Sequence, residues 1–166
     1  ALLESPGGRA EVCLHGAHVT SFVPSGQQPV LWLSPEAVFA PRKAIRGGVP
    51  VCWPWFADHP SDRSQPAHGV ARTAPWEVSA ASVPDPDTVC LECRLPSEVV
   101  NGVAPGMELT LAITLTSSLE LELKTSNHSP EAFALTEALH SYVNVGAIES
   151  VRLEGLAGVG YLDKTE

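Results

Sequence analysis

A strict alternation of large apolar residues with polar or small ones limits most strongly what this chain can fold into. From Met107 to Leu115 every second residue is large and apolar, and the residues between them are Glu, Thr or Ala. After Ser117 and Ser118, three leucines alternate with two glutamates and a lysine. Because successive side chains of a strand point to opposite faces, this pattern predicts an antiparallel hairpin with one buried and one solvent-facing side.

Further strands are predicted on both sides of this hairpin. They are Arg9–Leu14, Val19–Val23, Val30–Leu33, Trp76–Ala80, Thr88–Leu95, Ala134–Val143 and Ile148–Leu153. The 13 glycines and 15 prolines lie mostly between these segments, where turns require them. The one helical signal is short, because Ser34–Phe39 offers an N-cap serine, a proline at the first helical position and a single turn of residues. The sequence therefore predicts an all-β antiparallel sandwich.

Composition narrows the classes of partner and the cellular compartment. A length of 166 residues fits one domain, and 10 basic against 19 acidic residues leave a net charge of −9. This balance argues against a nucleic-acid or anionic-membrane surface, which needs clustered Lys and Arg. No apolar run is long enough to span a bilayer, the first residues do not resemble a signal peptide, and four cysteines form no disulfide framework. We therefore expect a cytoplasmic protein without nucleic-acid or membrane partners.

Two pairs of potential metal ligands favour structural roles. Cys90 and Cys93 have the spacing of zinc ligands, but residues three apart in a strand point to opposite faces. They are interpreted as structural thiols. His15 and His18 follow the first predicted strand without a third ligand nearby, so a role in a turn or at the rim of the sandwich is expected. No metal or cofactor site is predicted.

One segment interrupts the alternation. Residues 44–72 contain little regular pattern, four prolines, two tryptophans, three arginines and two histidines. An irregular loop of this length is uncommon unless it is functional, and its composition suits the lining of a site for a polar ring-shaped ligand. An equally good interpretation is that Trp53 and Trp55 close one end of the sandwich.

Two histidines are candidates for proton transfer. His68 precedes a glycine that allows close backbone contact, and His140 shares a strand face with Tyr142. A histidine of ordinary pKa, about 6.5, exchanges protons near neutrality. From the residues alone, a structural role is favoured for either histidine.

Three blocks of the sequence resemble a known family. The run KAIRGGVPVCWPWF at 43–56, followed by HGVAR at 68–72 and LHSY at 139–142, closely resembles the hexose-6-phosphate mutarotases, also called glucose-6-phosphate 1-epimerases. These belong to the aldose 1-epimerase, galactose mutarotase-like superfamily. Residues 156–158 and 161–164 resemble the segment that follows in the family.

The resemblance implies a fold, a reaction and roles for four residues. The fold is an antiparallel β-supersandwich, and the reaction interconverts the α and β anomers of a hexose 6-phosphate such as glucose 6-phosphate. It proceeds by general acid and base catalysis of ring opening, without a metal or cofactor. By similarity, His140 is the catalytic acid at the ring oxygen and His68 is the second catalytic histidine. Arg46 and Arg72 are expected to bind the substrate through its phosphate.

Departures from the family limit what this stretch of chain is expected to do. Ala67 stands where family members often carry a glutamine that contacts substrate, although Gln65 is nearby. The family's catalytic glutamate lies beyond Glu166. Residues 1–166 are therefore expected to be the N-terminal part of a single sandwich domain whose C-terminal part is absent, inactive alone and prone to self-association through exposed strand edges.

Two other functions remain open at this point. A non-catalytic carbohydrate-binding sandwich of the same ancestry would bind sugar phosphates without accelerating anomer exchange. A metal-dependent cupin-like enzyme would need a convergent set of histidines and carboxylates, and these residues do not supply one.

Overall fold

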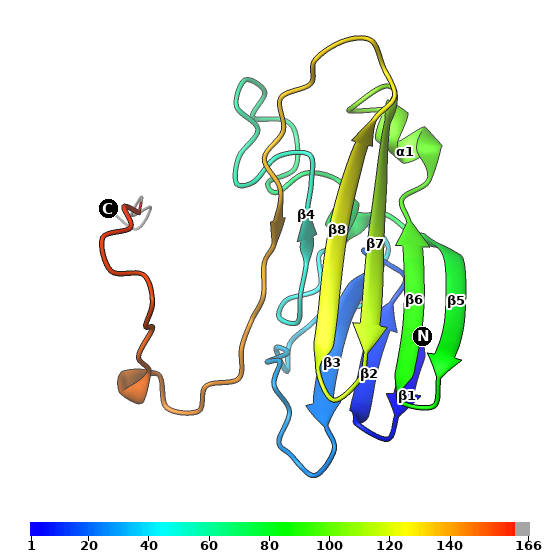
Figure 1. Cartoon of the computed structure of the whole chain (residues 1–166). Coiled ribbons are helices and arrows are strands. Elements are labelled where there is room, and N and C mark those ends of the chain that lie inside the picture. The colour runs from blue at the N-terminus through cyan, green and yellow to red at the C-terminus, as the bar shows by residue number, and fades with distance from the viewer. Residues whose placement is uncertain (162–166) are drawn as a thin grey trace.

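Two antiparallel sheets face each other in the computed structural model, which describes residues 1–161 (Figure 1). The first sheet has the order β1 (Leu2–Ser5), β2 (Gly8–Cys13) and β3 (His18–Pro24). The second has the order β5 (Glu77–Asp85), β6 (Thr88–Arg94), β7 (Met107–Leu115) and β8 (Leu119–Asn127). A third, two-stranded sheet joins β4 (Val51–Cys52) to β9 (Ala138–Leu139). The predicted all-β antiparallel architecture is confirmed.

The hairpin that the alternation predicted is β7 and β8. Leu115 pairs with Leu119 at the turn, and the register continues without a shift to Met107 opposite Asn127. Every apolar side chain of β7 is buried, while the residues between them are partly or fully exposed. Each buried leucine or isoleucine contributes roughly 1.5–3 kcal/mol, so the buried face of this one strand fixes its register.

The core lies between the two sheets. Alternate residues of β2 and β3 are buried on one side, and those of β6 and β7 on the other. β1 packs against β6 and β7, and β2 against β7, so the sheets meet face to face. Cys93 is fully buried in this core, whereas Cys90 lies on the other face beside Thr114. The prediction that these two thiols point to opposite faces is confirmed.

Several expected elements are shorter than their sequence patterns suggested. Residues 30–33 make isolated bridges, of Leu31 with Val143 and of Leu33 with Gly47, instead of a continuous strand. The predicted helical turn at residues 34–39 is a single hydrogen-bonded turn, because one turn does not repay helix nucleation. Of the predicted strand 134–143, only β9 forms a strand, paired with β4, and Val143 makes an isolated bridge with Leu31.

Several further elements were not predicted or were predicted wrongly. β1 and the short helix α1 (Ser97–Asn101) had no clear pattern in the sequence. Ile148–Leu153 was predicted as a strand but begins with the 3-10 turn η2 (Ile148–Ser150) and is exposed. A strand needs a neighbour for its backbone hydrogen bonds, and none of the described residues pairs with this segment. The other 3-10 turn, η1 (Ala71–Thr73), precedes β5.

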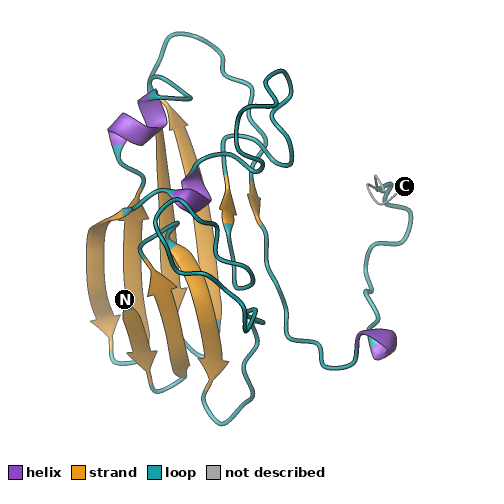
Figure 2. Cartoon of the chain, turned by 180° about the vertical axis from the view of Figure 1, so that it is seen from behind, coloured by secondary structure: helices purple, strands orange, loops and turns teal. Residues whose placement is uncertain are grey.

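Residues 144–161, here called the C-terminal arm, run away from both sheets in an extended path (Figures 1 and 2). All of them are exposed. Their large apolar members are Val145, Ile148, Val151, Leu153, Leu156, Val159 and Tyr161. Residues 162–164, the rest of the last block of family resemblance, lie outside the described residues. Among residues 1–161, no helix has the length and apolar character needed to cross a membrane.

Candidate functional site

Backbone pairing brings the third block of family resemblance onto the first. The N–H groups of Thr136, His140 and Tyr142 donate to the carbonyl oxygens of Pro54, Pro50 and Gly48, at 3.1, 3.0 and 2.8 Å. Residues 136–142 are therefore extended and antiparallel to residues 48–54, with β9 and β4 at the centre of the pairing. This alignment places the HSY residues beside the RGGVP run.

The imidazole of His140 lies within a group of five rings, here called the ring cluster, formed by Trp32, Phe56, His68, His140 and Tyr142. Its centroid is 4.9 Å from that of Tyr142, in a stacked arrangement, and 5.9 Å from that of His68, edge to face. The expectation that His140 and Tyr142 share a face is confirmed. Neither histidine is exposed fully or buried fully, so both are reachable by a ligand.

His68 has an unusual backbone and a defined tautomer. Its φ of +65° is left-handed, which a non-glycine residue rarely adopts and which is common at functional sites. Its Nδ1 accepts a hydrogen bond of 3.2 Å from the N–H of Ala57. Because Nδ1 is the acceptor, the neutral ring carries its proton on Nε2, and that nitrogen is a hydrogen-bond donor.

The two arginines lie on the two segments of the irregular loop that carry or approach the histidines. An Nη of Arg72, on η1, donates to the carbonyl oxygen of Ala67 at 2.8 Å, which ties it to the loop that bears His68. Arg46 is exposed, two residues before the carbonyl that accepts from Tyr142. Among residues 1–161, no side-chain hydrogen bond joins either guanidinium to His140. Gln65, the neighbour of Ala67, donates to Asp62 instead.

The two tryptophans of the irregular segment are core residues. Trp53 is fully buried and donates its indole N–H to Thr125, and Trp55 is nearly buried and donates to the carbonyl of Pro66. Their polar atoms are thus satisfied within the protein, which corrects the interpretation of these two rings as ligand lining. The exposed aromatic rings of the site are Trp32 and Phe56, at 37% and 39% exposure. Neither ring was predicted as a site residue, because each stands among other apolar residues that suit a core equally well.

His15 and His18 have different environments. His15 is partly exposed and bonds the carbonyl of Lys43, as a rim position predicts. His18 is 0% exposed, so the prediction of a rim role is wrong for this residue. Burial is the main reason why its pKa is lowered from 6.5 to about 4. Within the described part of the chain, no three His, Cys, Asp or Glu side chains are grouped so that they could hold a metal ion.

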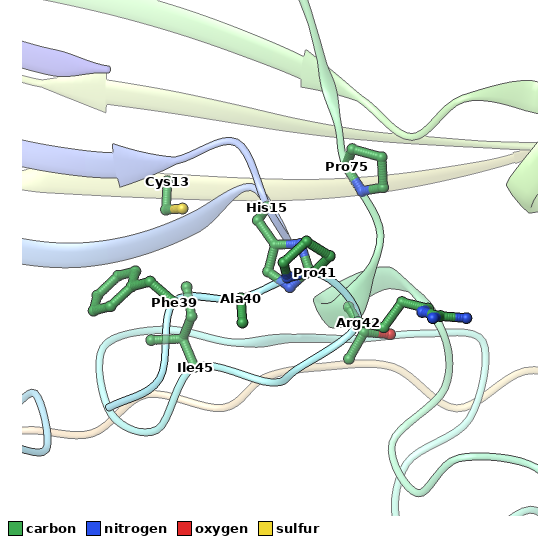
Figure 3. A pocket seen from close by; sticks show the side chains of 9 residues that line it. Cys13, His15, Phe39, Ala40, Pro41, Arg42, Ile45 and Pro75 are labelled. Carbon is green, nitrogen blue, oxygen red and sulfur yellow. The ribbon is translucent and has the colours of Figure 1, made fainter. Parts of the chain in front are cut away.

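A separate cavity of about 410 Å³ lies away from the ring cluster (Figure 3). It is bounded by one end of β2, the loop at residues 39–45 and Pro75, and its lining is mainly apolar. None of the four predicted site residues lines it. The cavity is therefore separate from the predicted site residues.

The fold of this chain is similar to that of solved mutarotase structures. The crystal structure described as a "putative mutarotase" from Salmonella typhimurium superposes with a TM-score of 0.78 at 38% identity, over 87% of this chain and 48% of that one. The two facing sheets thus define part of a mutarotase-type sandwich. More particularly, the chain belongs to the aldose 1-epimerase family, whose model, "Aldose 1-epimerase", matches residues 1–166.

Curated relatives agree with this assignment. Two proteins named "Putative glucose-6-phosphate 1-epimerase", from Escherichia coli (strain K12) and Salmonella typhimurium, are 39% and 37% identical to this chain over 164 and 163 residues. Each alignment covers 98% of this chain and 54% of the relative. The chain thus spans about half the length of the curated relatives it matches.

Proposed function

We propose that the protein containing this chain interconverts the α and β anomers of a hexose 6-phosphate such as glucose 6-phosphate. The observation that carries the proposal is the imidazole pair, His68 and His140, whose ring centroids are 5.9 Å apart within a cluster of partly exposed aromatic rings. Two imidazoles, which can donate and accept protons, lie here beside aromatic faces, and this combination suits a polar ring-shaped substrate.

In this proposal each imidazole has a separate role. His140 protonates the ring oxygen as the bond from that oxygen to C1 breaks, and a base outside these residues takes the proton of the anomeric hydroxyl. The open aldehyde rotates about its C1–C2 bond. On closure the C5 hydroxyl returns its proton to His140, and the base returns its proton to the oxygen at C1. His68 donates its Nε2–H to the substrate and stabilises charge as the ring opens, in keeping with the tautomer set by Ala57.

The direct test is anomer exchange by the full gene product that contains these residues. Two-dimensional NMR exchange spectroscopy on glucose 6-phosphate should detect α-to-β exchange far above the rate without protein. The alternative, a non-catalytic carbohydrate-binding sandwich, predicts saturable binding of the sugar phosphate with exchange no faster than in buffer. That second result would reject the proposed enzyme and retain the family fold.

Replacing Arg46 by alanine should weaken phosphate recognition selectively. Arg46 is exposed, so its loss is not expected to destabilise the fold. We expect KM for glucose 6-phosphate to rise about tenfold or more, because a charge-assisted bond to phosphate contributes roughly 1.5–3 kcal/mol. Exchange of unphosphorylated glucose, measured with the same variant, serves as the control and should not change. An equal loss with both sugars would contradict the phosphate role.

The polypeptide 1–166 by itself is expected to self-associate. β5 contains Pro84 and shifts of register, which hinder pairing at that edge, but β8 offers an open edge and the C-terminal arm exposes seven large apolar side chains. Sedimentation velocity should reveal dimers or larger species. Changing both Ile148 and Leu153 to lysine should shift the distribution toward monomer. A wild-type polypeptide that stays monomeric and melts cooperatively would contradict this prediction.

A further inference from the structure

We propose that the buried His18 is a positioning residue, which holds the glycine pair at 47–48 so that Arg46 and His140 keep their places in the site. Its kinetic consequences rest on the proposed function. Its structural consequences can be measured without any activity.

The contact that carries the proposal is a short hydrogen bond. His18 is the first residue of β3, and its Nε2 lies 2.7 Å from the carbonyl oxygen of Gly47. A carbonyl oxygen only accepts, so Nε2 carries the proton and donates. The residue bonded in this way directly follows Arg46 in the chain, and the bond therefore anchors the 47–48 peptide, next to the peptide that joins Arg46 to Gly47.

The ring also fills the space under the second glycine. A Cβ on Gly48 would lie 2.7 Å from Nε2 of His18, closer than real Cβ atoms approach, and the φ of Gly48 is +61°. Gly48 therefore lies directly against both the imidazole and the backbone carbonyl of Val19, whereas Gly47 approaches the backbone of residues 32–34. A larger residue at 48 or a smaller one at 18 would change this fit.

The backbone at Gly48 supports the catalytic segment. Its N–H donates to the carbonyl of Trp32 at 2.7 Å, and its own carbonyl accepts from Tyr142 at 2.8 Å. Two residues further on, the carbonyl of Pro50 accepts from His140. A shift of the glycine pair would thus move the backbone of Trp32 and Tyr142, which bond Gly48 directly. It would also disturb Pro50, whose carbonyl holds the backbone of His140.

The charges around His18 favour its neutral form. His15 and Arg72 both face it, each lowers its pKa, and burial has the largest effect. Its Nδ1 and the Nε of Arg72 are both buried without a hydrogen-bond partner among residues 1–161. A proton on Nδ1 would place a second buried positive charge near the guanidinium, so this position suits a neutral donor and not a lysine or arginine.

The first test compares hydrogen exchange in three variants of the full gene product. His18→Leu removes the donor, His18→Gln keeps an amide N–H near the position of Nε2, and Phe22→Leu perturbs a buried residue of the same strand that does not touch the glycine pair. We expect His18→Leu to lose protection at the amides of Gly48, His140 and Tyr142 by tenfold or more relative to Phe22→Leu. His18→Gln should retain most of it. Equal losses in His18→Leu and Phe22→Leu would overturn the proposal.

The second test uses kinetics, where the proposed function allows it. We expect His18→Leu to lower kcat/KM for glucose 6-phosphate by about tenfold or more, and His18→Gln to restore most of the loss, while Phe22→Leu has little effect. If the wild-type protein shows no exchange activity, the proposed function fails and the hydrogen-exchange result still decides the role of His18. If activity is present and His18→Leu matches Phe22→Leu, the positioning role fails alone.

The pH dependence of stability gives an independent measure of the neutral ring. The pKa of His18 is lowered to about 4 in the folded protein, so below pH 6.5 the unfolded chain binds a proton that the folded protein does not. The stability that depends on a neutral His18 is therefore fully present above about pH 6.5 and is lost as the pH falls toward 4. From about pH 7.5 to pH 5, the unfolding constant should rise about thirtyfold more in the wild type than in His18→Gln, measured by urea titration. Parallel pH profiles would contradict a neutral buried ring.

Discussion

Replacing His140 by alanine is expected to lower the turnover of hexose 6-phosphate anomer exchange by about 10²–10⁴-fold, the range that general acid catalysis supplies. KM should change little, because the ring cluster retains Trp32, Phe56, Tyr142 and His68 as binding surfaces. The loss then falls on kcat, as it does when an interaction is made only in the transition state. Exchange spectroscopy at several substrate concentrations separates the two parameters.

A second histidine provides the control for this change. His128 lies after β8 and is exposed beside Glu108, at a distance of 3.4 Å, outside the ring cluster. His128→Ala should leave both kinetic parameters near those of the wild type. If His140→Ala weakens binding as much as it slows turnover, His140 is a binding residue and the acid must be sought elsewhere.

The sheets could be predicted because their information is local. The alternation from Met107 to Leu115 indicates one buried face, because a hydrophobic period of two is typical of a half-buried β-strand. The same reasoning failed at Ile148–Leu153, where the pattern is similar but no described neighbour accepts the strand. Alternation identifies which residues could form a strand. Pairing decides which of them do, and pairing is a long-range property.

The site shows the same division between local and long-range information. The face shared by His140 and Tyr142 follows from their spacing of two. The meeting of His140 with His68 does not, since it depends on residues 48–54 pairing with 136–142. His18 is the clearest example. Its position after a strand suggested a rim residue, and only the return of residues 47–49 across β3 buries it, through the hydrogen bond from Val49 to Val19.

The close contact of Gly69 with Trp53 leads to the largest stability effect expected in this chain. A Cβ at Gly69 would lie within the van der Waals radius of the Trp53 carbonyl and 2.9 Å from the nitrogen of Pro54, and the φ of Gly69 is +75°. The same carbonyl accepts the N–H of Val70 at 2.9 Å. The clash can be relieved only by moving the backbone that bears His68 away from a fully buried tryptophan.

We therefore expect Gly69→Ala to lower the free energy of unfolding by more than about 4 kcal/mol, in the range of the most damaging single substitutions. Gly26→Ala is the matched control, because Gly26 has a similar φ of +69° with no atom within 4 Å of an added Cβ. That control should cost only the left-handed backbone penalty, about 1–2 kcal/mol. Urea unfolding of both variants separates close approach from backbone conformation. Equal losses would mean that the contact between residues 53 and 69 relaxes easily, and that the position of His68 does not depend on it.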